Sequence, residues 1–262
     1  MRLDIDEYAN LDSPLHHWDQ RFKFVGLMAL IFAFAFVRDL RMLPAMVMVT
    51  AAIYIVSKLP ASFMLTRLRY PSFFLLVVVL LLPFISGHTV VASIGPLDLR
   101  QEGLMSVLLI ATRFLSILTI GLVLFGTAPF LTEIRAMRAL GLPAILTDMT
   151  LLSFRYLHEV GGDLQRMETS MRLRGFREKR FSRHGLGVLA WLGGSILVRS
   201  YERSEWVYKA MIVRGYGHAP RLKDEFRASY RDMLFLGVTL LVAAAFIAGD
   251  ILFGHGSTAL LQ

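Results

Sequence analysis

The chain has 262 residues, of which 55% are hydrophobic and 18% are charged. A soluble domain usually carries about 25% charged residues, so this composition favours a membrane protein. The net charge of +8 comes almost wholly from residues 127–230, where seventeen Lys and Arg stand against ten Asp and Glu. The sequence has no recognised nucleic-acid-binding module. The positive charge is better explained by basic loops that face the anionic headgroups of a membrane.

Five runs with few or no charges predict five transmembrane helices, because a span needs about 20 largely apolar residues. The first run is the shortest, and Arg113 interrupts the fourth. An arginine is costly in lipid, so Arg113 should face the protein interior and pair there, or extend toward the interface. His88 is expected at the membrane interface. The runs are residues 24–37, 42–57, 73–97, 104–126 and 233–249.

The distribution of Lys and Arg predicts the topology, since these residues gather in cytoplasmic loops. The 58–72 loop has three cations and no acid, and the 127–230 segment is the richest in Arg. We expect an N-terminal cytoplasmic segment (1–23), a four-helix transmembrane region (24–126), a cytoplasmic or interfacial helical insert (127–230), and a last transmembrane helix with an outer tail (231–262). More than twenty residues with five acids precede the first run, so no cleaved signal peptide is expected.

Helical periodicity continues through the insert. Pro129 to Leu140 predicts an amphipathic helix with Thr127 as its cap, stopped by the sequence Gly-Leu-Pro at 141–143. A second helix is expected from Ala144 toward Val160, where two successive glycines should break or bend it.

An uncharged stretch of fifteen residues, His184 to Val198, lies further along the insert. It is too short for a comfortable sixth span. We expect instead a helix that is buried against other helices or lies at the membrane interface.

The same short motif ends two helices of the insert, forty residues apart. Each copy has Met, two spacers, Arg, Gly and an aromatic residue, and each should be an amphipathic helix with Met on its apolar face. Arg and Gly are also common at helix C-termini for reasons of capping alone, but the doubled motif favours a docking role. Met can repack against a partner and Arg can find a carboxylate. The motif residues are Met171, Arg174 and Gly175, and Met211, Arg214 and Gly215.

Signatures of catalysis and of cofactor binding are missing. The chain has no phosphate-binding G-x-x-x-x-G-K-[ST] loop and no cysteine, and His158-Glu159 lacks the second His of a zinc protease. His16 and His17, near Asp12 and Asp19, form the one cluster that suggests a metal site. Solvated polar residues before the first span explain that cluster better. We therefore predict no catalytic residue, no cofactor and no metal ligand.

These residues resemble a known family, the T component of energy-coupling factor (ECF) transporters, and within it the CbiQ-like branch associated with cobalt uptake. The resemblance covers nearly the whole chain, and the doubled Arg-Gly helix end is its most specific element. In the family the motif is usually Ala-Arg-Gly, whereas Leu173 and Val213 hold the Ala position here. Further matches are the stop at 139–143, Arg155-Tyr156 followed by Glu159, and the run from Asp12 to His16 before the first span.

The resemblance implies a scaffold in the cell membrane rather than an enzyme. Such a subunit joins two cytoplasmic ATP-binding-cassette (ABC) ATPases to a separate membrane subunit that captures the substrate. Each motif helix is expected to dock one ATPase, and ATP-driven motion of the pair would pass through these helices. The alternative is a membrane-embedded enzyme or metal-binding protein that uses the N-terminal His and Asp residues.

Overall fold

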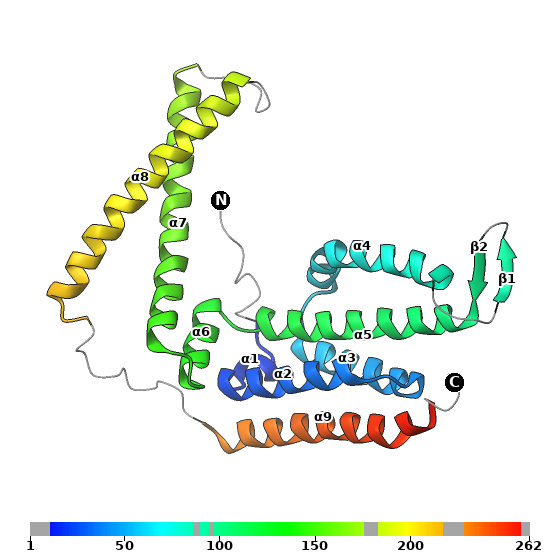
Figure 1. Ribbon diagram of the computed structural model, residues 1–262. Helices are drawn as coiled ribbons and strands as arrows, with labels where there is room; N and C mark the ends of the chain where they lie inside the picture. The colour runs from blue at the N-terminus through cyan, green and yellow to red at the C-terminus, as the bar shows by residue number, and fades with distance from the viewer. Residues whose placement is uncertain (1–10, 86–89, 95–96, 176–182, 217–227, 258–262) are drawn as a thin grey trace. The chain divides into compact units, whose positions relative to one another are not determined.

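The computed structural model describes residues 11–85, 90–94, 97–175, 183–216 and 228–257. The chain divides into two compact units. One comprises residues 5–141 and 226–262, and the other is formed mainly by residues 142–225. We call them the membrane bundle and the helical pair (Figure 1).

The membrane bundle is helical except for one short antiparallel hairpin (Figure 1). Its elements are α1 (Pro14–His17), α2 (Gln20–Phe36), η1 (Leu40–Met42), α3 (Leu43–Ser57), α4 (Ala61–Ile85), β1 (Val90–Ile94), β2 (Leu97–Arg100), α5 (Gln101–Gly126), α6 (Phe130–Ala139) and α9 (Tyr230–Ser257).

Helix α2 is the centre of the bundle and packs against α5, α6 and α9. Leu27 and Phe34 on this helix have no exposed surface, and the Phe34 ring meets Phe246 of α9 edge-on at 4.9 Å. Gly26 allows the close approach of α9, since a Cβ at this position would lie 2.5 Å from Thr239 Oγ1. Close van der Waals packing of these side chains stabilises the association of helices in lipid.

Among the described residues, four helices are long and apolar enough to cross a membrane: Leu40–Ser57, Ala61–Leu82, Gly103–Gly126 and Tyr230–Leu252. Many of their large apolar side chains are exposed, as expected where lipid replaces water. The fold class, an all-α polytopic membrane protein, is therefore confirmed. Helix α2 has 17 residues and is not among the four, so the fifth span stays a prediction.

The predicted third span was wrong in its extent. The structure has a helix from Ala61 to Ile85 and then a hairpin, whereas the sequence suggested a loop at 58–72 and a span at 73–97. The cations of this segment, Arg67 and Arg69, lie in the first turns of α4, where long side chains can reach the headgroups while the helix enters lipid. His88 lies outside the described residues.

The helical pair consists of α7 (Ala144–Leu173) and α8 (Arg183–Val213). The predicted break at Gly161 and Gly162 does not occur, because a helix-interior glycine costs only about 1 kcal/mol relative to alanine and does not by itself end a helix. The stretch 184–198 is helical, as predicted, but most of its described side chains are exposed, so burial against other helices of this chain is not found. Trp191, for example, is 82% exposed.

Candidate coupling surface

Both repeated motifs end a helix at the predicted glycine. Gly175 has φ +86° and Gly215 has φ +76°, a left-handed conformation that favours glycine at a helix C-terminus. At the second end the Gly215 N–H donates to the Ile212 carbonyl (2.9 Å) and the Tyr216 N–H donates to the Met211 carbonyl (3.0 Å). The glycines and backbone amides therefore account for the caps.

The arginines of the motifs are not used by these caps. The side chains of Arg174 and Arg214 are exposed. Among the described residues neither side chain has a hydrogen bond or an ion pair, and only their backbone amides bond within the last turn. Capping thus explains the glycines of the motif and leaves both arginines available to a partner.

The two motif helices run antiparallel and cross in Figure 1, and an ion pair joins them. Arg203 of α8 lies 3.2 Å from a carboxylate oxygen of Asp163 and 3.2 Å from one of Glu159, both on α7. Asp163 and Arg203 are forty residues apart, as are Arg174 and Arg214. Equivalent positions of the repeat therefore meet at this ion pair, so the contact is symmetric with respect to the repeat.

This symmetry fixes the position of the motif ends. Each motif arginine lies eleven residues beyond the crossing residue of its own helix (163 to 174, 203 to 214). At 1.5 Å per residue, the two arginines extend about 16 Å in opposite directions and lie roughly 30 Å apart. The helical pair thus presents two similar, exposed cationic ends, one at each extremity.

An apolar groove of about 580 Å³ separates the helices on the side where α8 ends. Met211 and Val207, predicted on the apolar face of the second motif, line it. Tyr216 closes this end, since its hydroxyl donates to Asp148 Oδ2 (3.0 Å). Met171 of the first motif is half-buried, and Phe176 lies outside the described residues.

A second feature, a buried polar cluster, lies within the membrane bundle around the first turns of α2. Lys23 of α2 has no exposed surface, and its Nζ donates to the Leu15 carbonyl (3.3 Å), to Thr127 Oγ1 (2.9 Å) and to the Thr127 carbonyl (3.4 Å). One turn earlier on the same helix, Gln20 Nε2 donates to Glu133 Oε1 of α6 (3.3 Å). The cluster therefore ties α1, α2, the end of α5 and α6 together.

Burial has a clear electrostatic effect in this cluster. Desolvation lowers the pKa of Lys23 to about 8, and the negative charge of Glu133 opposes that lowering. Thr127, predicted as the cap of α6, instead accepts from Lys23 and donates to the Val123 carbonyl, while Pro129 holds the cap position. Helix α6 ends at Ala139 and Gly141, with φ +114°, turns the chain toward α7.

The family model described as CbiQ, cobalt transport protein, matches residues 12–226. The chain belongs to this family. No curated protein matches it. A CbiQ cobalt transport protein is a membrane component of a transporter, and this agrees with the four candidate spans.

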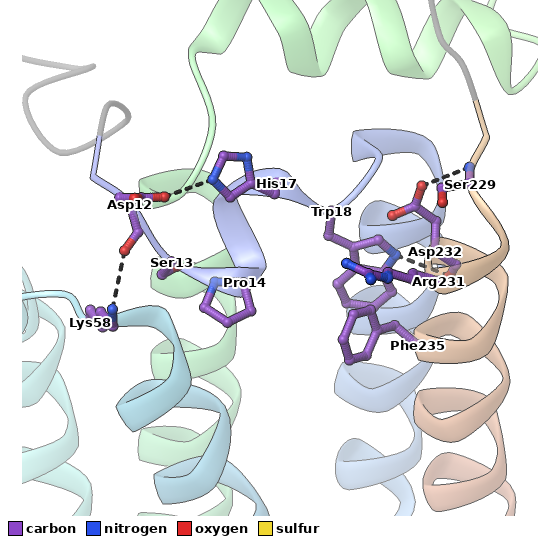
Figure 2. Close-up of a pocket in the computed structure, with 10 residues that line it drawn as sticks. All are labelled: Asp12, Ser13, Pro14, His17, Trp18, Lys58, Ser229, Arg231, Asp232 and Phe235. Atoms are coloured by element: carbon purple, nitrogen blue, oxygen red, sulfur yellow. Dashed lines mark hydrogen bonds and ion pairs between the residues drawn. The ribbon is translucent and has the colours of Figure 1, made fainter.

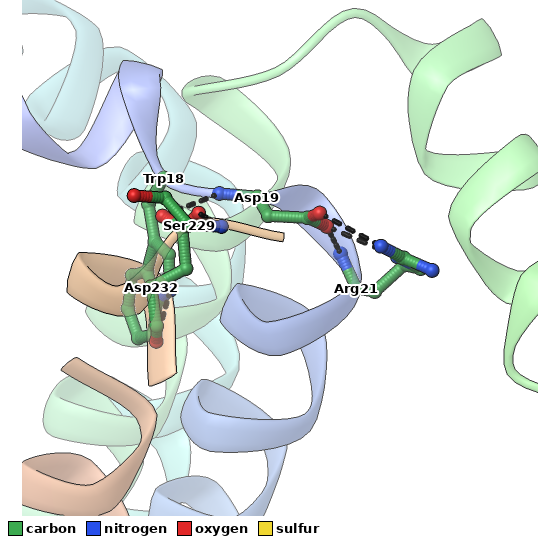
Figure 3. A network of polar contacts seen from close by, with 5 residues as sticks. All are labelled: Trp18, Asp19, Arg21, Ser229 and Asp232. Atoms are coloured by element: carbon green, nitrogen blue, oxygen red, sulfur yellow. Dashed lines mark hydrogen bonds and ion pairs between the residues drawn. The ribbon is translucent and has the colours of Figure 1, made fainter. Parts of the chain in front are cut away.

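The N-terminal polar residues of this CbiQ protein do not converge. His17 Nε2 bonds to Asp12 Oδ1 (2.7 Å), His16 Nδ1 bonds to the Ser13 hydroxyl (2.6 Å), and Asp19 pairs with Arg21 (3.1 Å; Figure 3). Within the described residues, no group of three or more His, Cys, Asp or Glu could hold a metal ion.

Arg113 faces the protein interior, as predicted. It is half-buried, and its guanidinium donates to the carbonyl of Val37, the C-cap residue of α2. A cation at this position satisfies a helix-terminal carbonyl and suits the negative end of the helix dipole. Nearby, Asp250 of α9 accepts from the Arg38 N–H (2.7 Å), so both contacts fix the α2 terminus within the bundle.

Proposed function

We propose that this chain is the transmembrane coupling (T) subunit of an ECF-type ABC importer in the cell membrane, most simply for cobalt ions. Two cytoplasmic ABC ATPases dock on the ends of the helical pair, one at Arg174 and Gly175 and one at Arg214 and Gly215. A separate membrane subunit captures the ion. The observation that carries this proposal is that the two repeated helix ends each present an exposed arginine with no partner among the described residues, because two similar ATPases need two similar docking ends.

Docking follows from the chemistry of the ends. An exposed guanidinium forms charge-assisted, often bidentate bonds with a carboxylate. The exposed apolar residues beside each arginine, Leu173 at 84% and Val213 at 87% exposure, supply the surface that a groove on the partner would bury. Burying these side chains on docking is favourable, since apolar surface leaves water.

Transmission to the membrane needs a rigid connection. Motion of the helical pair reaches the bundle along the chain through Gly141 and α6. The buried cluster of Lys23, Thr127, Gln20 and Glu133 holds α6 and α2 together, so that α6 does not move alone. Force on α7 is thereby delivered to α2, the central helix of the bundle.

The test is an Arg174→Ala/Arg214→Ala double variant, assayed for cobalt uptake in cells and for recovery of the ATPases on affinity purification. We expect uptake and ATPase recovery to fall at least tenfold, because losing a partner of a buried charge pair typically costs about 2–5 kcal/mol. Membrane insertion and helix content should not change, since glycine and backbone bonds form the caps.

The matched control is Arg172→Ala/Lys209→Ala, which removes one exposed cation from each of the same helices. Uptake and ATPase recovery should remain near the wild-type level in this control. Wild-type uptake and ATPase recovery in the Arg174→Ala/Arg214→Ala variant would contradict the proposal. The motif would then serve only to cap the two helices.

A further inference from the structure

A cavity of about 560 Å³ with polar and apolar walls lies at one end of the membrane bundle (Figure 2). Its walls come from the region of α1, from Lys58 just after α3, and from the first turns of α9. One candidate span, Leu40–Ser57, ends directly before Lys58, and another, Tyr230–Leu252, begins beside Ser229. The cavity therefore lies at the level where a span leaves the hydrocarbon and meets lipid headgroups.

The carboxylates of the cavity are already engaged. Asp232 is buried, and its two oxygens accept from the backbone amides of Asp19 (3.2 Å) and Ser229 (2.9 Å; Figure 3). Asp12 Oδ1 bonds to His17 Nε2 at 2.7 Å. The side chain of Asp12 is 91% exposed, so water and salt screen its charge from the rest of the cavity.

The cations of the cavity, by contrast, have bonding capacity to spare. The only bond of Lys58 Nζ to a described residue is to the Asp12 carbonyl, at the long distance of 3.4 Å. Arg231 is exposed, and its guanidinium has no hydrogen bond or ion pair within the described part of the chain. Lys58 and Arg231 therefore have hydrogen-bond donors left free by the described residues, whereas the carboxylates of the cavity already accept hydrogen bonds. This arrangement favours a ligand that brings anionic oxygens of its own.

The cavity also has an aromatic wall. The rings of Trp18 and Phe235 lie with their centroids 5.8 Å apart, and Trp18 Nε1 donates to the Asp232 carbonyl (3.2 Å). Figure 2 shows both rings beside Arg231. A tryptophan fixed beside cations at a span end is typical of the membrane interface, where one side of a ligand is apolar and the other is hydrated.

We propose that this cavity binds the phosphate of a phospholipid headgroup. Arg231 donates to the phosphate oxygens, and the glycerol and first acyl carbons lie against Trp18 and Phe235. Lys58, on the opposite side of the cavity (Figure 2), donates to the polar end of the headgroup. The bound lipid joins the end of α3 to the start of α9 on the face where α1 lies. The site is independent of the ATPase-docking ends.

The test is native mass spectrometry of the purified full-length chain in mild detergent, titrated with phosphatidylglycerol. A Lys58→Gln/Arg231→Gln variant should bind the lipid about tenfold more weakly, because two charge-assisted bonds are lost. Lys58→Arg, which keeps the charge, should retain wild-type affinity. Arg41→Gln, which removes a cation at the opposite end of the same span, should also retain it.

Equal affinity of the wild type and the double variant would overturn the proposal, as would an equal loss in the Arg41→Gln control. Adding inorganic phosphate at the concentration of the lipid tests whether the cavity prefers a lipid or a soluble phosphate compound. We expect it to leave the bound lipid in place, since it cannot use the aromatic wall. Displacement would assign the cavity to a soluble phosphate compound and refute the lipid assignment.

Discussion

Replacing Lys23 with methionine should destabilise the bundle strongly. The ammonium makes three hydrogen bonds at 2.9–3.4 Å and has no exposed surface. Its removal leaves the Leu15 and Thr127 oxygens of this buried region without their donor. A buried acceptor left without its partner costs about 1–3 kcal/mol, and more where the lost donor was charged. We therefore expect Lys23→Met to lose about 2 kcal/mol or more.

The measurement is heat-induced unfolding in detergent micelles, followed by the fluorescence of the tryptophans. Lys209→Met is the control, because Lys209 forms an exposed i,i+4 pair with Glu205 and such pairs contribute only about 0.3–0.5 kcal/mol. The reasoning is refuted if Lys23→Met unfolds at the wild-type temperature, or if Lys209→Met loses as much stability as Lys23→Met.

Three further predictions concern pH, topology and the ion. The pKa of Lys23 is about 8 in the folded chain, and its ordinary value is 10.5. Between these two pH values the unfolded chain binds more protons than the folded chain, so the free energy of unfolding should rise with pH. A Lys23→Met variant should lack this rise. A single cysteine replacing Arg180 should resist an impermeant reagent, and those replacing Asp98 or Thr258 should react. Labelling at position 180 from outside would overturn the topology. Calorimetry of the purified chain with cobalt should show no micromolar binding, and the His16→Ala/His17→Ala variant should retain cobalt uptake. Micromolar binding that is lost in this variant would show that this chain itself binds the ion.

Local signals were sufficient to predict where α6, α7 and α8 end. A glycine after the last periodic residue marked the ends at 141, 175 and 215, and all three glycines have positive φ. The same signal gave a wrong prediction of a helix break at Gly161 and Gly162. In the interior of a long helix, neighbouring hydrogen bonds outweigh the free-energy cost of glycine. Glycine ends a helix only where the chain also needs a left-handed turn.

Two parts of the candidate site needed three-dimensional information. Lys23 looked like one of the cations that flank a span, and only the contacts with α5 and α6 reveal that it is buried. The contact between the two helices of the helical pair could be predicted from the sequence only in part. The forty-residue repeat that relates the two motifs also relates Asp163 to Arg203, and opposite charges at equivalent positions are expected if two repeats pair about a twofold axis.

The most direct measurement is the number of ATPase subunits that each variant retains in native mass spectrometry of the complex without nucleotide. The two ends lie roughly 30 Å apart along the helical pair, so each should hold its ATPase separately. We predict two ATPases on the wild-type chain, one on Arg174→Ala, one on Arg214→Ala and none on the double variant. Two ATPases on every variant would contradict the assignment of the Arg-Gly helix ends as the docking sites.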